Sequence, residues 1–289
     1  AGTLPVGLTL SSAGLLSGTP LTAGNALFTV TVTDASGGTG AQDFSLTIKN
    51  LTTTAVFSLT NPSVAYNAVT FTAVVLGVNP TGTLDFKIDG ITIAGCGAKS
   101  LSPNLAQCVT TISTVGTRVI TADYSGDTNN AASTGTQSDG QVVTAPTITV
   151  SPPTLPGGTA NAAYSQAITA SGGTVAYTFA FSTGALPDGL TLSSGGLLSG
   201  TPTATGTFNF TIAATDANGF TGATAYSVTI NPGQTLTVAV TGTGFGSVTV
   251  TGINCPGDCS ETFATGTVIE LTAMPTAGST FTGWSDGCT

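Results

Sequence analysis

Apolar and polar residues alternate over short stretches along most of the chain. In residues 28–32 (FTVTV) and 247–250 (SVTV), Phe or Val alternates with Thr or Ser. This period of two is typical of a strand with one face buried and the other exposed. The 39 Gly and 14 Pro residues interrupt such runs about every 8 to 12 residues, as in β-sandwiches. Helix-favouring stretches are nearly absent, so the sequence predicts an all-β chain.

One part of the pattern occurs twice. Residues 4–20 (LPVGLTLSSAGLLSGTP) return as residues 186–202 (LPDGLTLSSGGLLSGTP), with 15 of 17 positions identical and an offset of 182 residues (186 − 4). The match continues more loosely at Gly24 and Gly206, Phe28 and Phe210, Asp34 and Asp216, and residues 44–48 and 226–230. Repetition on this scale indicates an array of similar modules. A reactive site usually occurs once, so the repeat favours an architectural role.

The repeat and its surroundings predict four segments: residues 1–50, 51–144, 145–232 and 233–289. The second copy of the repeat is preceded by about 40 strand-like residues from Thr147 onward, which the first copy lacks. A sandwich without its leading strands would expose an unpaired edge and half a core. We therefore expect either that residue 1 falls inside a domain, which we favour, or that another chain supplies the missing strands.

The segment 51–144 has its own strand pattern. Turn signals such as Asn61-Pro62, Asp89-Gly90 and Ser125-Gly126-Asp127 separate its apolar runs. The expected strands are Thr54–Leu59, Val69–Leu76, Gly82–Ile88, Cys108–Ser113 and Arg118–Tyr124. About seven short strands in about 95 residues is typical of an Ig sandwich.

These segments resemble known families. The LPxGLTLSSxGxLSGTP run, followed by a TxTDAxG strand end, is similar to the bacterial family called putative Ig, whose folds are cadherin-like sandwiches. It covers residues 1–50 in part and 147–231 in full. Residues 69–73, 80–86 and 120–127 resemble a bacterial Ig-like repeat, and residues 266–288 resemble bacterial repeats related to internalin B-repeats. The last pattern normally continues past its Cys, so we expect it to be truncated at Thr289. All three families imply large, secreted or surface-exposed bacterial proteins, and they imply no activity.

Composition narrows the function classes further. Only 6% of the residues are charged, with 4 Lys+Arg, 13 Asp+Glu and no His, for a net charge of −9. Four scattered basic residues cannot neutralise a phosphate backbone, so nucleic acid is excluded as a partner. No apolar run approaches the roughly 18 residues of a spanning helix, so membrane insertion is not expected.

The cysteines are the strongest chemical candidates: Cys96, Cys108, Cys255, Cys259 and Cys288. An exported protein would use them as disulfides, and a zinc site without His would have to be nearly all thiolate. Cys96 and Cys108 lie on neighbouring segments, so we expect a hairpin-closing disulfide that adds about 2–3 kcal/mol of stability. Cys255 and Cys259 lie in a C-x-x-x-C turn and can bridge each other. Cys288 would then pair outside this sequence.

Calcium is the next candidate. Asp34 and Asp216 occur in Asp-Ala-Ser-Gly and Asp-Ala-Asn-Gly turns, where cadherin-like modules place an Asp-x-Asp calcium motif. Ser36 and Asn218 replace the second carboxylate, and calcium prefers six to eight oxygen ligands, usually with several carboxylates. An ordinary turn in which Asp bonds its own backbone is the favoured interpretation. No cofactor is therefore expected, with Asp34 and Asp216 kept as weak calcium candidates.

No catalytic set can be assembled from the sequence. His is absent and the carboxylates are spread thinly, mostly at turns, whereas acid–base catalysis usually recruits His or paired carboxylates. Isopeptide cross-links need a core-facing lysine, for which Lys49, Lys87 and Lys99 give weak support. Trp284 is expected to be structural, as a buried Trp beside a disulfide is in many cores. The alternating residues Phe179, Phe181, Phe208 and Phe210 are also expected in the core.

We therefore expect tandem Ig-like and cadherin-like β-sandwiches in an extended rod, with a small β-rich repeat at the C-terminus. The predicted function is non-enzymatic: an adhesin stalk, or the subunit of an extracellular filament, on the bacterial cell surface. The expected partners are copies of the chain, neighbouring modules of the same protein, or host and matrix surface ligands. Two alternatives stay open, namely a spacer or glycan-binding appendage of a secreted enzyme, and Ig-like decoration of a phage particle.

Overall fold

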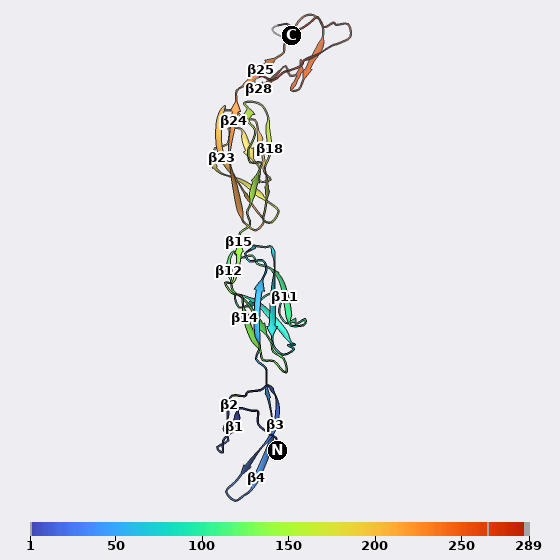
Figure 1. Cartoon of the computed structure of the whole chain (residues 1–289). Helices are drawn as coiled ribbons and strands as arrows, with labels where there is room; N and C mark the ends of the chain where they lie inside the picture. Colours follow the sequence, from blue (N-terminus) through green and yellow to red (C-terminus); the bar gives the residue numbers. More distant parts are fainter. Residues whose placement is uncertain (1, 265, 286–289) are drawn as a thin grey trace. The chain divides into compact units, whose positions relative to one another are not determined.

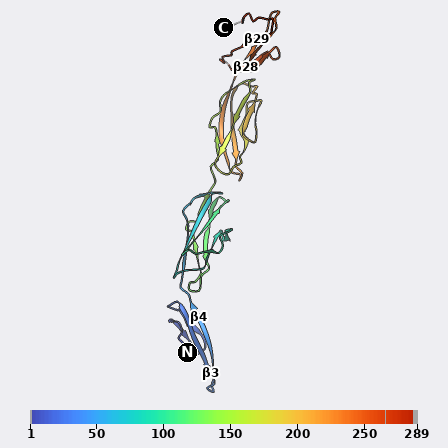
Figure 2. The same cartoon turned by 90° about the vertical axis from the view of Figure 1, so that its right-hand side faces the viewer.

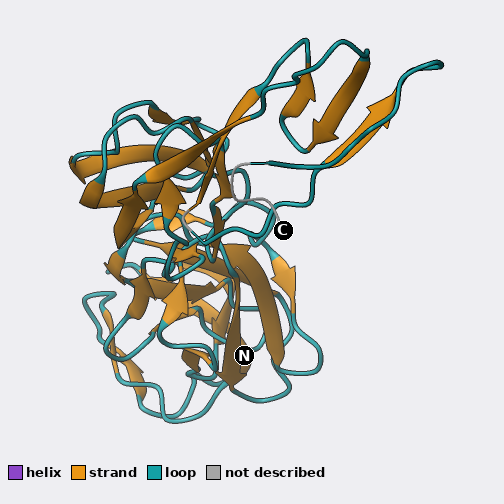
Figure 3. Ribbon diagram, turned by 90° about the horizontal axis from the view of Figure 1, so that it is seen from above, coloured by secondary structure: helices purple, strands orange, loops and turns teal. Residues whose placement is uncertain are grey.

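The computed structural model describes residues 2–264 and 266–285, which form strands, turns and loops and no helix (Figure 3). The all-β prediction is confirmed. Accordingly, no helix in the described part of the chain has the length and apolar character needed to cross a membrane. The chain divides into two compact units, Ala1–Ala145 and Pro146–Thr289, and each is described by itself (Figure 1).

The first unit begins with what we call the first copy, residues 2–49. It consists of two antiparallel hairpins, and the longer one is seen clearly in Figure 2. Gly2 forms an isolated antiparallel bridge with Phe28 in that hairpin. The strands are β1 (Leu8–Leu10) paired with β2 (Leu16–Gly18), and β3 (Gly24–Thr33) paired with β4 (Thr39–Ile48).

The rest of the first unit is the middle module, residues 51–144. Its strands form sheets of order β10-β8-β13-β14, with β9 beside β8, and β11-β7-β5 and β12-β15-β6. Alternate residues of β7, β8 and β13 are buried. The sheet that contains β7 and the sheet that contains β8 and β13 therefore both contribute to the core, as in a sandwich. The bounds are β5 (Thr53–Ser58), β6 (Ser63–Val64), β7 (Ala68–Leu76), β8 (Thr83–Ile88), β9 (Ile91–Thr92), β10 (Lys99–Ser100), β11 (Leu105–Thr111), β12 (Gly116–Arg118), β13 (Ile120–Tyr124), β14 (Ser133–Thr136) and β15 (Gln141–Thr144).

The second unit begins with the second copy, residues 146–231. Its sheets have the orders β17-β24-β23-β20, β18-β22-β21 and β16-β19, and their apolar residues form one buried cluster. The bounds are β16 (Thr149–Ser151), β17 (Gly158–Thr159), β18 (Tyr164–Ala167), β19 (Thr169–Ser171), β20 (Thr178–Gly184), β21 (Leu190–Leu192), β22 (Leu197–Gly200), β23 (Gly206–Thr215) and β24 (Thr221–Asn231).

The described part of the C-terminal segment, residues 233–264 and 266–285, has a smaller core. Val238, Val248, Ile253 and Cys255 are its buried residues. Two small sheets surround them, β25-β28 and β27-β26-β29. The strands are β25 (Gly233–Thr237), β26 (Gly246–Val250), β27 (Ile253–Cys255), β28 (Ser260–Ala264) and β29 (Thr272–Pro275).

The two copies fold alike wherever both have sequence. In the first copy Phe28 lies opposite Phe44, and in the second copy Phe210 lies opposite Tyr226, so the strand register is the same at the offset of 182 residues (210 − 28). Their burial differs. Within residues 2–49 no side chain is fully buried, whereas the equivalent strands of the second copy carry the centre of its core.

Candidate functional site

The two turn aspartates have nearly the same surroundings in both copies. Asp34 accepts hydrogen bonds from the backbone N–H groups of Ser36 and Gly38, each at 2.8 Å, and from the Ser36 hydroxyl at 2.8 Å. The hydroxyl of Ser36, followed by these backbone groups, holds the pKa of Asp34 below its usual value. The carboxylate therefore closes its own turn.

Asp216 does the same in the second copy and is more deeply buried, with 5% of its surface exposed. It accepts hydrogen bonds from the backbone N–H groups of Thr174 (2.9 Å), Asn218 (2.9 Å) and Phe220 (2.8 Å). The bond from Thr174 is the largest cause that lowers the pKa of Asp216. In the first copy all three of these bonds reach Oδ1 of Asp34, whereas in the second copy N–H groups engage both carboxylate oxygens of Asp216. In addition, no cluster of three or more His, Cys, Asp or Glu residues suited to a metal occurs in the described residues.

A second polar centre lies at the end of the middle module. Asp127 accepts the Tyr124 hydroxyl at 2.9 Å and the backbone N–H groups of Thr81, Asn129 and Asn130, each at 2.7 Å. The amide of Asn130, which is 1% exposed, also donates to both carboxylate oxygens. The backbone N–H of Thr81 is the largest cause that lowers the pKa of Asp127, and burial, followed by Asp127, raises the pKa of Tyr124 to about 12. The network ties two turns 46 residues apart in sequence.

Sequence reasoning identified Ser125-Gly126-Asp127 as a turn and missed this network. The signal that could have revealed it is the run Tyr-Ser-Gly-Asp, in which a strand-end Tyr precedes a turn Asp. Its partner Thr81 lies in the turn between β7 and β8, and nothing local in the sequence links that turn to Asp127. The network fixes loop conformations and holds its polar groups in mutual hydrogen bonds, so it leaves no group poised to react.

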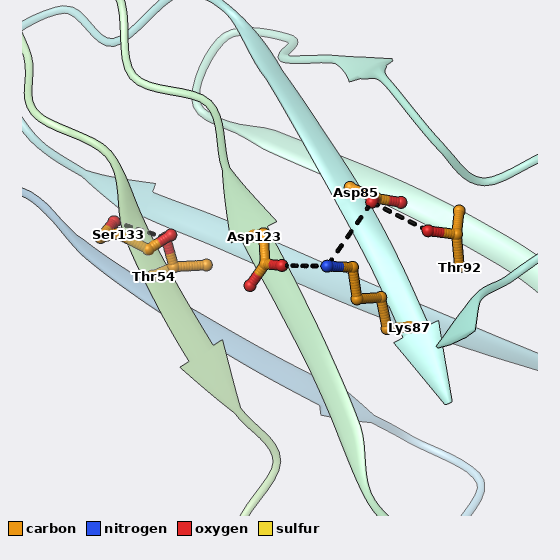
Figure 4. A network of polar contacts seen from close by, with 6 residues as sticks. All are labelled: Thr54, Asp85, Lys87, Thr92, Asp123 and Ser133. Atoms are coloured by element: carbon orange, nitrogen blue, oxygen red, sulfur yellow. Dashed lines mark hydrogen bonds and ion pairs between the residues drawn. The ribbon is translucent and has the colours of Figure 1, made fainter. Parts of the chain in front are cut away.

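A cluster of charged side chains lies on the outward face of β8 and β13 (Figure 4). The Lys87 ammonium lies 2.6 Å from an Asp123 oxygen and 3.9 Å from Asp85, whose carboxylate also accepts from Thr92 at 3.0 Å. The hydrogen bond between Lys87 and Asp123 raises the pKa of Lys87 and lowers the pKa of Asp123. Lys87 is thus held as an ammonium on the outside of the sheet, because its neighbour Phe86 occupies the core. An ammonium is no nucleophile, so this pair does not favour an isopeptide bond.

Four of the five cysteines form disulfides. Cys96 is bonded to Cys108, with the Cα atoms 5.5 Å apart, and Cys255 to Cys259, with the Cα atoms 4.5 Å apart. Cys288 lies outside the described residues. The first bridge does not close a hairpin, because β10 pairs with β8 while Cys108 lies in β11, which pairs with β7. It joins the loop beside one sheet to a strand of the other sheet.

Two expectations about aromatic side chains are wrong. Trp284 is 37% exposed and packs edge-on against Phe281, with ring centroids 4.8 Å apart, rather than lying in the core. Phe181 is 42% exposed, although it lies opposite the buried Ile212; it belongs to β20, which is the edge strand of its sheet. Phe179 and Phe210 are buried as expected, and Phe208 packs against that core.

Two shallow grooves occupy the same place in the two copies. One, of about 430 Å³, is lined by Gly2, Leu27, Phe28, Thr29, Asp43, Phe44 and Ser45. The other, of about 320 Å³, is lined by Gly184, Asn209, Phe210, Thr211, Ala225, Tyr226 and Ser227, with Thr183. Asp43 is the one ionisable carboxylate in these linings, and it already accepts a hydrogen bond from Thr29 at 2.7 Å. The grooves follow from the shared fold of the hairpin and carry no catalytic pair.

The fold and these sites define a chain of Ig-like β-sandwich modules whose polar groups serve turns and strands. Family models match the same segments. Residues 1–49 and 146–231 match the model described as "Putative Ig domain", residues 57–144 match "Bacterial Ig-like domain (group 3)", and residues 236–289 match "Divergent InlB B-repeat domain". The resemblances drawn from the sequence are confirmed. The chain is a multi-domain array of bacterial Ig-like and B-repeat modules.

Several solved structures are similar in fold at low identity. Fibronectin(III)-like modules of Clostridium thermocellum CbhA are 14% identical, over 61% of this chain and 94% of theirs, with a TM-score of 0.25. A 1.5-MDa bacterial ice-binding adhesin is 18% identical over 72% and 74%, with a TM-score of 0.30. The N-terminal eight Ig domains of the Down Syndrome Cell Adhesion Molecule are 11% identical, with a TM-score of 0.35. The match covers 79% of this chain and 31% of theirs. These likenesses carry no conclusion about function. No curated protein sequence matches the chain.

Proposed function

We propose that the chain is a non-enzymatic structural segment of a large secreted bacterial surface protein, serving as an adhesin stalk or as the subunit of an extracellular filament. The observation that carries this proposal is the repeated hairpin. The same strands, register and aspartate-closed turn are built twice, at Asp34 and at Asp216. Copying a module changes length and spacing, whereas a reactive site needs no copy.

We propose that each of the segments 1–50, 51–144, 145–232 and 233–289 is one module. Between the first copy and the middle module little chain is free. Asn50 donates its backbone N–H to Asn129 at 2.8 Å and accepts from the N–H of Ala131 at 2.8 Å. Such short, hydrogen-bonded connections suit a spacer, because they restrict hinge motion.

An extracellular location is supported by the cysteines. The Cys96–Cys108 and Cys255–Cys259 bridges would persist in an oxidising compartment and be reduced in most cytosols. Faces rich in Thr and poor in charge would allow neighbouring copies to pack laterally without burying unpaired ions. The proposed partners are therefore copies of this chain, neighbouring modules of the same protein, or host and matrix surface ligands.

Imaging of the native material tests the proposal. Electron microscopy of cells labelled with an antibody against this chain should show the label outside the cell. Regular fibres would favour the filament subunit, and isolated tethers would favour the stalk. The purified chain should bind no sugar on a glycan array and turn over no substrate in a hydrolase panel. Saturable glycan binding would instead support an enzyme appendage, label on phage particles would support phage decoration, and cytoplasmic label would refute the surface location.

A further inference from the structure

One long strand of the middle module is paired on one side and open on the other. β11 pairs with β7 in an uninterrupted register, from Leu105 opposite Val74 to Thr111 opposite Ala68. Among the described residues no strand pairs with the other side of β11 (Figure 1). The preceding turn reaches that side at one point, where the N–H of Ser102 donates to the Leu105 carbonyl at 2.9 Å. We call this side of residues 105–111 the free edge.

The backbone groups on the free edge follow from the ladder with β7. The N–H of Val75 donates to the Asn104 carbonyl at 2.8 Å, and in an antiparallel pair the directly bonded residues recur at every second position. Residues 104, 106, 108 and 110 therefore bond to β7, whereas Gln107, Val109 and Thr111 present their N–H and C=O groups to the free edge. All three are exposed, Val109 to 64%. A further strand can thus be added without opening the ladder with β7.

Other edge strands of the sandwich modules carry protection that β11 lacks. β5 is the opposite edge of the same sheet, and its Thr54 hydroxyl lies 2.8 Å from the Ser133 hydroxyl of β14. β20, an edge strand of the second copy, has a register shift after Phe181, and the N–H of Phe179 donates to the Ser194 carbonyl at 3.0 Å. Covers and bulges of this kind prevent sheets from pairing with one another, as do edge charges and Pro. Residues 105–111 include no charged residue and no Pro.

We propose that β11 pairs with β11 of a second copy of this chain, in antiparallel orientation about a two-fold axis beside Cys108. This register places Gln107 of each copy opposite Val109 of the other, and Leu105 opposite Thr111. It joins two three-stranded sheets into one continuous sheet of order β5-β7-β11-β11-β7-β5. The pairing gives a specific contact to the packing between copies proposed above, and it rests on that part of the proposed function.

A second copy is the occupant that the edge itself specifies. A two-fold contact uses the same strand on both sides, and all seven residues of β11 are matched when the axis passes beside Cys108. The outward-pointing groups of one strand then face the outward-pointing groups of the other. Because residues 105–111 carry no charge, two identical edges meet without like-charge repulsion. A charged partner would find no opposite charge on this strand.

The side chains also suit this pairing, and the pairing closes. Gln107 and Val109 lie on the exposed face of the sheet, so the β-branched Val109 meets the aliphatic stem of Gln107 across the new strand pair. Pairing uses both free edges, and the outer edges of the joined sheet are the two β5 strands, each protected by its own β14. The contact therefore ends at two copies and does not propagate.

Sedimentation of the full chain tests the pairing. One strand from each copy makes a small interface of the weak class, so the measurement extends to about 1 mM chain. Free thiols are alkylated beforehand, which excludes dimers linked by a disulfide. We expect a reversible equilibrium between monomer and dimer. A chain that stays monomeric over the whole range would overturn the proposal.

Hydrogen exchange followed by NMR at low and high concentration locates the contact. The N–H groups of Gln107, Val109 and Thr111 should exchange at least about tenfold more slowly in the dimer. Those of Ala106 and Cys108 already bond to β7 and should change by less than about twofold, so the alternation within one strand is its own control. A dimer that protects another strand, and leaves the outward N–H groups of β11 unchanged, would overturn the proposal.

Substitutions at Val109 test the edge directly. Val109→Pro removes an N–H that makes no bond to β7, and Pro is tolerated on edge strands. It should weaken the dimer at least about tenfold, because each copy loses one hydrogen bond. Val109→Lys keeps the N–H and should weaken the dimer by a similar factor, since a charge on an edge opposes the addition of a strand.

Leu76→Lys is the matched control for the added charge. Leu76 is 61% exposed, against 64% for Val109, and lies on the same exposed face, but β7 has a partner strand on each side. This variant should change the dimer by less than about twofold. A dimer that survives both Val109 variants, or that Leu76→Lys weakens equally, would overturn the proposal. Failure of the surface location would appear instead as antibody label inside the cell, so the two proposals fail in different experiments.

Discussion

At the residue scale, equivalent leucines of the two copies have different environments. Leu198 is fully buried in the second copy, and its equivalent Leu16 is 39% exposed in the first. Leu198→Ala should lower the free energy of unfolding of its module by about 2–5 kcal/mol, because it leaves a cavity. Leu16→Ala should cost less than about 1 kcal/mol, because water already reaches the site. Hydrogen exchange of β23 and β3 measures both, and equal costs would contradict the difference in burial between Leu198 and Leu16.

Tyr124 gives a prediction about alkaline pH. Its pKa is raised to about 12, by burial first and then by Asp127, against about 10 in an unfolded chain. The stabilisation by the neutral hydroxyl is therefore complete below pH 10 and is lost as the pH rises from 10 to 12. We expect Tyr124 to ionise near pH 12 in a titration of ultraviolet absorbance, and the middle module to lose stability over the same interval. Burial raises the pKa of Tyr164 and Tyr226 as well, so the step is assigned by substitution.

Tyr124→Phe is the control for that titration. The variant should lack the late ionisation and lose less stability between pH 10 and 12, although it is less stable than the parent at neutral pH because Asp127 loses a donor. Tyr164→Phe, in the other unit, removes a phenol outside this network whose pKa is also raised by burial, and it should leave the step near pH 12 in place. A late step that survives in Tyr124→Phe would show that Tyr124 was wrongly assigned.

Residue roles were predictable from the sequence where the cause is local. The turn role of Asp34 and Asp216 follows from the Asp-x-Ser/Asn-Gly pattern, because the carboxylate bonds N–H groups two and four residues on. The Tyr124–Asp127 network was not predictable, because Thr81 reaches it through the fold. The exposure of Phe181 was not predictable either, since alternation alone does not reveal which strand lies at the edge of a sheet.

At the scale of elements, the disulfide of the middle module gives a prediction. Cys96 and Cys108 are 12 residues apart, and closing such a loop stabilises the fold by about 2–3 kcal/mol through the unfolded chain. The double substitution Cys96→Ala and Cys108→Ala should lower the unfolding free energy of the middle module by that amount. Calorimetry of the full chain measures it as a shift of one transition.

The Cys255→Ala and Cys259→Ala pair is the matched comparison. These cysteines are 4 residues apart, so their loop contributes less chain entropy. Its removal should shift the C-terminal transition and leave that of the middle module in place. Adding a reductant should mimic the first double substitution in the parent and have no further effect on the middle module in the variant. If neither treatment changed the stability of the middle module, the stabilising role of the Cys96–Cys108 disulfide would be contradicted.

Strands were predicted better than their partners. All five expected strands of the middle module overlap strands in the structure, because a half-buried strand shows its period in sequence. Sheet membership has no such local signal. The sequence placed Cys96 and Cys108 on one hairpin, yet β10 and β11 belong to different sheets. The exposure of Trp284 likewise depends on how little core the small C-terminal segment can offer.

At the scale of the whole molecule, scarcity of charge determines how the chain meets a protease. Trypsin has four target residues here: Lys49, Lys87, Lys99 and Arg118. Lys87 and Lys99 lie in paired strands, Arg118 lies in β12 and contacts Asp89 at 3.2 Å, and Lys49 precedes the hydrogen-bonded Asn50. Cleavage requires a segment to detach locally before it fits the protease.

We therefore expect the native chain to survive trypsin under conditions that digest the denatured chain completely. The first slow cut should fall at Lys49, the exposed site between the first copy and the middle module, and intact-mass measurement would show the fragments 1–49 and 50–289. Lys87 should be the last site cut, because its ammonium is paired with Asp123 and β8 has partners on both sides. The order follows from local opening, which is least costly where few strand contacts must break. Early cleavage at Lys87 would mean that the middle module opens as readily as the connection before it, which no semi-rigid spacer can do.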